Sequence, residues 1–369
     1  MAVLAPNQGQ TNGQILRLHV ISVYDRQGWG QPVVAYTMLV PEGWRVEGGI
    51  QWNGKWRCLS TDLVINQLRV TSPDGRYAFE AFPDYGANWY DDALKIQTHQ
   101  QQIAMGQQVC PLTRPFNASG FLTGVFLPAF RRGAQVESVQ QNPQAAQAYQ
   151  AFLMQNYGLV LQQTGAQLST DAARMVLREQ GSEEMVMANT SLTAARSMSA
   201  SAAANGAIAN STDYTLGASK VVSFRAPAGQ LQQMEPLFGA MLGSIHVNPA
   251  WQAAVAQVLL NIGTKMIGGA VDRANIMHDA QMKIGDTIMS TWQNRQDSLD
   301  RISHSWSQTI RGTGDFVDPT THAQVELPWG YDNVWSDGNG DYLLTTIQGF
   351  NPNSDIQTNR NWTQMQAVR

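Results

Sequence analysis

The sequence predicts an α+β protein with two antiparallel-sheet-plus-helix units, a long amphipathic helix and a small C-terminal β tail. Three observations support this fold class. Apolar and polar residues alternate over several short runs in two parts of the chain, as they do in half-buried strands. Each group of strands is followed by a stretch with helical spacing of its apolar residues, and residues 249–312 keep such a stripe far longer than the others.

The first unit is expected to span residues 14–134, after a polar, mobile tail over residues 1–13. Strand patterns begin at Ile15 and recur through the next eighty or so residues. Asn53 and Gly54 form a dipeptide that is typical of a β-hairpin turn. Residues 73–75, Pro-Asp-Gly, indicate a second turn between strands.

The second unit is expected to span residues 135–248. Asn142 is placed to cap a helix that Gly158 is expected to end. A hairpin is predicted through residues 180–182, Gln-Gly-Ser. Residues 193–211 are low-complexity Ala, Ser and Asn, and they are expected to form a mobile loop or surface lid.

The long helix is predicted over residues 249–312, with Asn248 as its N-cap and Gly312 just beyond its end. One interpretation is a bend near Gly268, which would give two ordinary helices packed on the body of the protein, because each helical glycine costs about 1 kcal/mol relative to alanine. The other is a protruding arm that meets a protein partner or a second copy of the chain.

The C-terminal tail covers residues 313–369. Its short strands and turns contain too little apolar material for an independent core. We expect a small β-meander that rests on the long helix or on the second unit and is packed by its tryptophans and tyrosines.

The composition excludes some classes of function. Charged residues make up only 14% of the chain, the net charge is −4 and the isoelectric point is near 5.9. Without a basic cluster, this balance argues against nucleic-acid binding. No apolar run reaches the length of a membrane span. A polar surface built from Gln, Asn, Ser and Thr favours a secreted or surface-exposed bacterial protein.

The two cysteines, Cys58 and Cys110, are disulfide candidates, because both flank strand-like segments of one unit. Two buried free thiols are the alternative in a cytoplasmic protein. The polar surface and the disulfide candidates lead us to expect an extracytoplasmic protein, periplasmic or secreted, with a cytoplasmic protein as the alternative. Because the N-terminus lacks a basic segment followed by an apolar one, we expect the leader to be absent from this chain.

Several segments of the chain form a recognisable set. They are VPEGW (40–44), GGIQW (48–52), TSPDGR (71–76), the run from FRAP to NPAW (224–251), DRISHSWSQTIRG (300–312) and the tail that begins VELPWGYDNVW. Together these segments resemble a group of uncharacterised bacterial proteins. The unit that closes with SIHVNPAW is also similar to α+β domains of the PsbP/Mog1-like type. This resemblance implies a fold and brings no catalytic residue set.

One constellation has the spacing of a metal site. Asp337, Asn339 and Asp341 alternate with glycines, as oxygen ligands do in the first half of a calcium loop. Tyr342 and Gln348 stand where such a loop has its glycine and its bidentate glutamate, so a tight Asx/Gly turn is the favoured interpretation. No catalytic motif is present, and we predict no cofactor.

The predicted function is that of a non-catalytic, extracytoplasmic bacterial protein that acts by protein or surface interaction through the 249–312 helix. One alternative is a hydrolase with its cleft between the two units, under the 193–211 loop. Another alternative is a homo-oligomeric scaffold assembled through the long helix.

Overall fold

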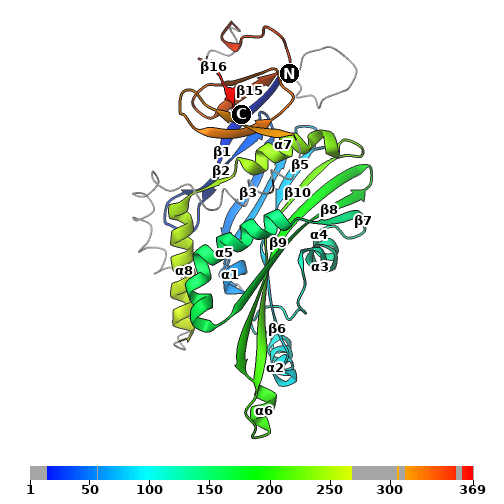
Figure 1. The fold of residues 1–369 in the computed structure, drawn as a ribbon, viewed down its shortest axis with the longest axis vertical. Coiled ribbons are helices and arrows are strands. Elements are labelled where there is room, and N and C mark those ends of the chain that lie inside the picture. The colour runs from blue at the N-terminus through cyan, green and yellow to red at the C-terminus, as the bar shows by residue number, and fades with distance from the viewer. Residues whose placement is uncertain (1–14, 56, 268–305, 307–311, 355–359, 369) are drawn as a thin grey trace.

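The computed structural model describes residues 15–55, 57–267, 306, 312–354 and 360–368. It shows an elongated mixed α/β molecule built around one large sheet and one small sheet (Figure 1). The C-terminal tail lies at one end of the long axis, and a long β-hairpin reaches the other end.

The first part of the chain forms six strands. The turn between β4 and β5 uses the predicted Pro-Asp-Gly sequence, where the Ser72 hydroxyl donates to Asp74 and the Gly75 amide donates to the Ser72 carbonyl. Between β3 and β4, in contrast, Asn53 and Gly54 do not make a two-residue turn, because the short helix α1 (Leu59–Asp62) lies in the connection. The strands are β1 (Ile15–Asp25), β2 (Val33–Pro41), β3 (Arg45–Trp52), β4 (Val64–Thr71), β5 (Ala78–Ala81) and β6 (Tyr85–Tyr90).

The second part supplies the longest strands. β8 (Gln167–Glu179) and β9 (Ser182–Met198) form the hairpin that the sequence predicts. Its turn residues Gln180 and Gly181 have φ of 40° and 81°, as a two-residue hairpin turn with positive φ at both positions requires. β10 (Asn210–Pro227) pairs with β9, and β7 (Gln135–Gln141) pairs with β8 at the edge.

Strands from both predicted units lie in the same sheet. The path through it runs β16-β14-β15-β1-β3-β4-β5-β10-β9-β8-β7. β5 and β6 both pair antiparallel with β10, and β2 joins through β1 and the short β11 (His246–Val247). Strands from the two sides of the predicted boundary near residue 134 therefore hydrogen-bond to one another within one sheet.

The tail extends this sheet and adds a second one. β15 (Asp341–Thr345) pairs with β1, which places the tail beside the first strand of the chain. The small sheet has the order β13-β12-β17 and contacts helix α7. The remaining tail elements are β12 (Thr313–Val317), β13 (Gln324–Pro328), β14 (Asn333–Ser336), the 3₁₀ turn Pro352–Ser354, β16 (Thr363–Gln364) and β17 (Gln366–Ala367).

Helices cover both faces of the large sheet (Figure 1). Helices α5 (Pro143–Thr164), α7 (Leu231–Gly243) and α8 (Pro249–Ile267) lie on one face, here called the inner face. The outer face carries the continuous stretch α3 (Ala118–Phe121), the π-helical turn Leu122–Phe126 and α4 (Leu127–Phe130). Helices α2 (Ala93–Ala104) and α6 (Ala200–Ala204) lie together at the far tip of the β9–β10 hairpin.

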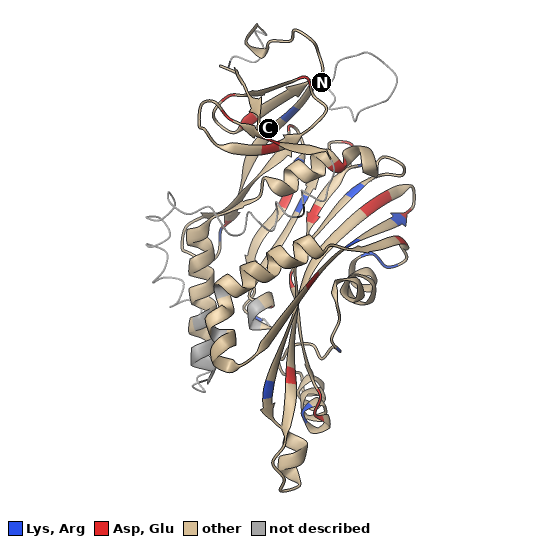
Figure 2. Cartoon of the chain, in the orientation of Figure 1, with Lys and Arg blue, Asp and Glu red and all other residues tan. Residues whose placement is uncertain are grey.

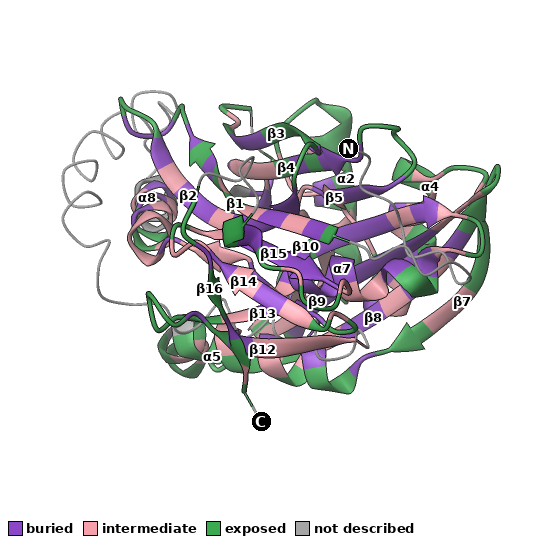
Figure 3. Ribbon diagram, turned by 90° about the horizontal axis from the view of Figure 1, so that it is seen from above, coloured by how far each residue is buried: buried purple, intermediate pink, exposed green. Residues whose placement is uncertain are grey.

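Each face has its own apolar core. Buried residues lie along the central strands, and exposed ones gather at the rims (Figure 3). The inner core includes Phe224, Phe238 and Met241, whereas the outer core includes Phe126 and Met175. Charged residues are spaced along the strands, with Lys and Arg interspersed among Asp and Glu (Figure 2).

Two helix predictions differ from the structure or lie partly outside it. Helix α5 continues past Gly158 to Thr164 and ends at Gly165, which has φ of 65°. A single glycine costs a helix only about 1 kcal/mol, which packing on β8 and β9 outweighs. Of the predicted 249–312 helix, α8 covers Pro249–Ile267, and residues 268–305 lie outside the described residues.

The segment 193–211 is ordered where a loop was expected. Its first residues complete β9, its last two begin β10, and α6 lies between them. Asp92, the N-cap of α2, accepts hydrogen bonds from the hydroxyls of Ser199 and Ser201 at 2.5 and 2.7 Å. These bonds fix α6 against α2 through polar contacts, a feature that the apolar pattern of the sequence does not reveal.

Among the described helices, none combines the length and apolar character that a membrane crossing requires.

Candidate functional site

A cavity of about 570 Å³ lies between the inner face of the sheet and helices α5, α7 and α8. Its floor is formed by β4, β5, β9 and β10, and α5 and α8 supply its walls. Most of the side chains that line it are apolar, among them Phe79, Phe152, Leu216 and Trp251. Small-molecule sites in proteins typically measure about 300–1,000 Å³ and have this apolar character, so the cavity is the leading candidate for a binding site.

The sheet is irregular where it borders the cavity. β5 ends at Ala81 and β6 begins at Tyr85, although both pair with the same strand, β10. Opposite this interruption, the pairing of β10 with β9 shifts register between Ser219 and Val222. Bulges of this kind redirect side chains and are common beside functional sites.

Lys220 lies within this bulge and has φ of 54°, in the left-handed region that favours glycine. A residue with a Cβ atom occupies this region at a cost of roughly 1–2 kcal/mol. The Lys220 amide donates to the Asp84 carboxylate, with 3.3 Å between the nitrogen and Oδ1. The interruption between β5 and β6 therefore brings Asp84 beside Lys220, 136 residues away in sequence.

Asp84 and Lys220 are the two oppositely charged side chains of the cavity lining. Both side chains are exposed by surface area, and both line the cavity, where the nearby protein makes desolvation the largest influence on their titration. Burial raises the pKa of Asp84, which Lys220 and a hydrogen bond from Ser219 partly offset. Burial also lowers the pKa of Lys220, against the attraction of Asp84. Both effects favour an uncharged pair in an apolar site.

Hydroxyl groups surround this pair. Tyr149 of α5 is buried, and its phenol lies close enough to Ser219 on β10 and Ser191 on β9 for their hydroxyls to act on its titration. Burial raises the pKa of Tyr149 to about 12, so the phenol stays protonated at neutral pH. The cavity thus has a polar cluster near Lys220, and the rest of its described lining is mainly apolar, with a few polar side chains such as Asn66 and Gln252.

Asp25 holds one wall of the cavity in place. Its carboxylate is fully buried and joins the end of β1 to β3 and to the start of α8. Glycine is required at position 28, because a Cβ there would lie 2.5 Å from Trp52 Nε1. Oδ2 accepts the indole N–H groups of Trp29, Trp52 and Trp251 at 2.8, 2.8 and 2.9 Å, and Oδ1 accepts the amides of Gln27 and Gly28 at 3.1 and 3.0 Å.

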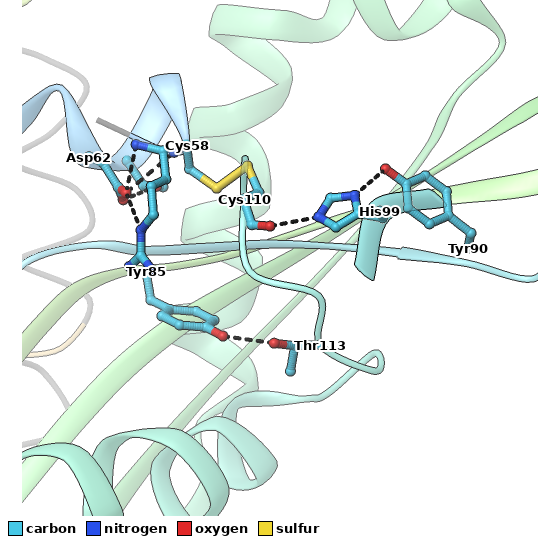
Figure 4. The surroundings of a disulfide bond; sticks show 9 residues. Cys58, Asp62, Tyr85, Tyr90, His99, Cys110 and Thr113 are labelled. Carbon is cyan, nitrogen blue, oxygen red and sulfur yellow. Dashed lines mark hydrogen bonds and ion pairs between the residues drawn. A yellow bond between two sulfur atoms is a disulfide. The ribbon is translucent and has the colours of Figure 1, made fainter. Parts of the chain in front are cut away.

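The predicted disulfide between Cys58 and Cys110 is present (Figure 4). It ties the start of α1 to the segment that follows α2. His99 of α2 bonds the Cys110 carbonyl oxygen through Nε2 at 2.8 Å and the Tyr90 hydroxyl through Nδ1 at 3.1 Å. Because Thr61 of α1 lines the cavity, the disulfide braces the cavity wall from outside.

The calcium-loop candidates lie in the turn between β14 and β15, far along the chain from the cavity lining. Asp337 Oδ1 accepts the backbone amides of Asn339 and Asp341 at 2.8 and 3.1 Å. Arg360 forms ion pairs with the carboxylates of both Asp337 and Asp341. These contacts describe an Asx turn held by an arginine. Across the described part of the chain, no group of three or more His, Cys, Asp or Glu side chains is arranged to hold a metal ion.

Asp84 and Lys220 were not identified from the sequence. Each is a single charge inside an apolar run, in AFPDYG and in LGASKVVSF. A lone charge in a strand pattern is a signal, but it does not reveal a partner that strand pairing supplies from another part of the chain.

Comparisons with protein-family models, with curated proteins and with solved structures each returned no match for this chain. Its function must therefore be inferred from the residues of the cavity.

Proposed function

We propose that this chain is a non-catalytic binding protein that holds one amphiphilic small molecule in the inner cavity. The observation that carries the proposal is the combination of about 570 Å³ of space, a mainly apolar lining and a polar cluster at Lys220 and Asp84. The apolar body of a ligand would replace water along Phe152, Leu216 and Trp251. Its polar group would reach Lys220 and Asp84, where the protein has unusual backbone geometry and desolvated polar groups.

The proposal includes an extracytoplasmic location, periplasmic or secreted, in a bacterium. The Cys58–Cys110 disulfide supports it, because disulfides persist in oxidising compartments and are rare in the cytoplasm. A protein in such a compartment that encloses an apolar ligand would carry it through water or present it at a surface.

The hydrolase alternative has less support. Asp84 is the one carboxylate in the described lining of the cavity, and that lining includes no histidine. Lys95 touches the hydroxyls of Ser197 and Ser211 at 2.6 and 2.9 Å, but it also pairs with Asp213 at 2.8 Å. The Lys95 amine is therefore engaged in an ion pair and lies outside the residues that line the cavity.

Self-association or a protein partner engaged through residues 249–312 also remains a proposal, as does a likeness of the strand units to PsbP/Mog1-like domains. In the described part of that segment, Ala254, Val258 and Ile262 are buried within the chain's own core. The start of α8 therefore uses its apolar face internally, and any partner surface would involve other residues.

Probe displacement with two matched variants of α8 tests the binding function. N-phenyl-1-naphthylamine, a neutral fluorophore, should bind the parent chain once and be displaced by decanol. Val255 lines the cavity, whereas Ala256 is exposed on the same helix. We expect Val255→Trp to weaken probe binding by about tenfold or more, equivalent to about 1.4 kcal/mol, and Ala256→Trp to leave it within about twofold. No saturable binding by the parent, or equal binding by both variants, would reject the proposal.

A further inference from the structure

Lys220 is chemically distinct from Lys55 and Lys95, the other lysines whose side chains the structure describes. The five lysines are Lys55, Lys95, Lys220, Lys265 and Lys283. Among the described residues that line the cavity, Lys220 is the one lysine. Lys55 lies in an exposed turn, and Lys95 is paired with Asp213. A reagent that enters the cavity would therefore meet one particular amine.

The Lys220 amine is available for reaction. Among the described residues, no carboxylate oxygen lies within 4.0 Å of its Nζ, and the contact with Asp84 that fixes the bulge is made by the backbone amide. Asp84 is nevertheless close enough for its charge to act on Lys220. The left-handed backbone of Lys220 is costly to maintain, and its side chain lines the cavity, where desolvation lowers its pKa. A strained backbone at an amine that lines a cavity points to a role in ligand binding.

The charges of the cavity select among possible polar groups. A ligand carboxylate would need a positive counter-charge, but desolvation disfavours the charged form of Lys220, and an ionised Asp84 would repel the carboxylate. A neutral carbonyl needs no counter-charge and fits an uncharged pair. It also offers an electrophilic carbon to the amine and an oxygen that accepts a hydrogen bond.

We propose that Lys220 forms a reversible imine with an aldehyde or ketone at the polar end of the bound amphiphile, with Asp84 as proton donor and counter-ion. This inference rests on the proposed binding function and names its ligand class. In the first step the Lys220 nitrogen lone pair attacks the carbonyl carbon, a C–N bond forms, and a proton moves from nitrogen to oxygen to give a carbinolamine. Asp84 then protonates the hydroxyl, the C–O bond breaks and water leaves.

The products are a protonated imine and the Asp84 carboxylate, which compensate each other's charge. The net change is the replacement of the carbonyl oxygen by the Lys220 nitrogen with release of one water, so no oxidant or reductant is needed. The starting pair must be a neutral amine and a neutral acid. Burial favours this state by lowering the pKa of Lys220 and raising that of Asp84.

Among the described residues of the cavity lining, the other titratable groups do not compete for these protons. They are the tyrosines Tyr36, Tyr149 and Tyr157, and burial raises the pKa of each. All three are therefore neutral phenols near neutral pH. Lys220 and Asp84 are left as the pair that exchanges protons with a bound carbonyl compound.

Reductive trapping tests the imine. The full chain is incubated with decanal and cyanoborohydride at pH 6.5, and the adduct is located by intact mass and peptide mapping. We expect one decyl group on Lys220, formed about tenfold or more faster than on Lys55, because the cavity holds the bound aldehyde beside this amine and its lowered pKa leaves more of it neutral. Lys220→Met should abolish the adduct. Lys220→Arg should also abolish it, while decanol still displaces the fluorescent probe.

Decanol separates the two proposals, because it has the same chain and no carbonyl group. If decanol displaces the probe but decanal leaves Lys220 unmodified, or modifies Lys55 equally fast, the imine is wrong and the binding function stands. If decanoate displaces the probe more strongly than decanal does, a carboxylate ligand replaces the carbonyl one. If none of the three compounds displaces the probe, both proposals fail.

Discussion

Replacement of Asp25 by asparagine should destabilise the fold strongly, although the two side chains have nearly the same shape. The buried carboxylate accepts five hydrogen bonds, three from indoles and two from backbone amides. Asparagine has one acceptor oxygen, and its amide nitrogen would face other donors in either orientation. This variant therefore removes a charged acceptor from donors that are excluded from water.

The expected loss of stability follows from the less costly of the two orientations of the asparagine amide. If the asparagine oxygen keeps the three indoles, the amides of Gln27 and Gly28 lose their acceptor and the three remaining bonds lose their charge assistance. Unsatisfied buried donors cost about 1–3 kcal/mol each, and loss of one partner from a buried charged network about 3–5 kcal/mol. We expect Asp25→Asn to lower the free energy of unfolding by about 3–5 kcal/mol.

Urea unfolding followed by far-ultraviolet circular dichroism measures this change without relying on tryptophan emission. Asp332→Asn is the matched control, because Asp332 is exposed, and it should change the free energy of unfolding by less than about 0.5 kcal/mol. Trp251→Phe removes one donor and should cost about 1.5–3 kcal/mol. Because Trp251 also lines the cavity, both Asp25→Asn and Trp251→Phe should weaken probe binding. An Asp25→Asn variant as stable as the control would refute this role for the carboxylate.

Three other changes test the cavity region. Lys220→Gly should be more stable to urea than Lys220→Ala by about 1 kcal/mol, since glycine relieves the positive φ, and an alanine variant of equal stability would contradict the strained backbone. Cys58→Ser together with Cys110→Ser should lower the free energy of unfolding by about 4 kcal/mol, because the disulfide closes a loop with a sequence separation of 52. A change below about 1 kcal/mol, measured by calorimetry, would argue against the bond. The pKa of Asp84 is raised by burial, so its contribution to stability is greatest below its ordinary value of 3.8 and is lost as pH rises through its value in the folded protein. Asp84→Asn should therefore flatten the fall in stability from acid to neutral pH, and an unchanged pH profile of the urea midpoint would exclude that contribution.

Local patterns predicted many of the individual elements. The Gln180–Gly181 turn was identified because two-residue hairpins need residues that accept positive φ. The start of α5 was identified because asparagine is a preferred N-cap residue. In the structure, the Asn142 side chain accepts the Ala145 amide as an N-cap does. Such features depend on residues close in sequence, so the sequence displays them directly.

The arrangement of the elements could not be predicted in the same way. The pairing of β5 with β10 joins segments whose apolar alternation fits many partners, and the register shift at Ser219 has no local signature. The cavity residues Asp84 and Lys220 come together only through that pairing. The far half of the β9–β10 hairpin is rich in small residues, and its order comes from backbone pairing and from Asp92 rather than from apolar burial.

The most direct test of the binding proposal is the mass of the full chain purified from its native host, measured under native and then denaturing conditions. We predict a native mass that exceeds the mass of the chain by one small molecule, which is released on denaturation in acid and is identified in an organic extract. Masses that agree under both conditions, from a chain that also fails to bind N-phenyl-1-naphthylamine, would contradict the assignment of the inner cavity as a ligand site.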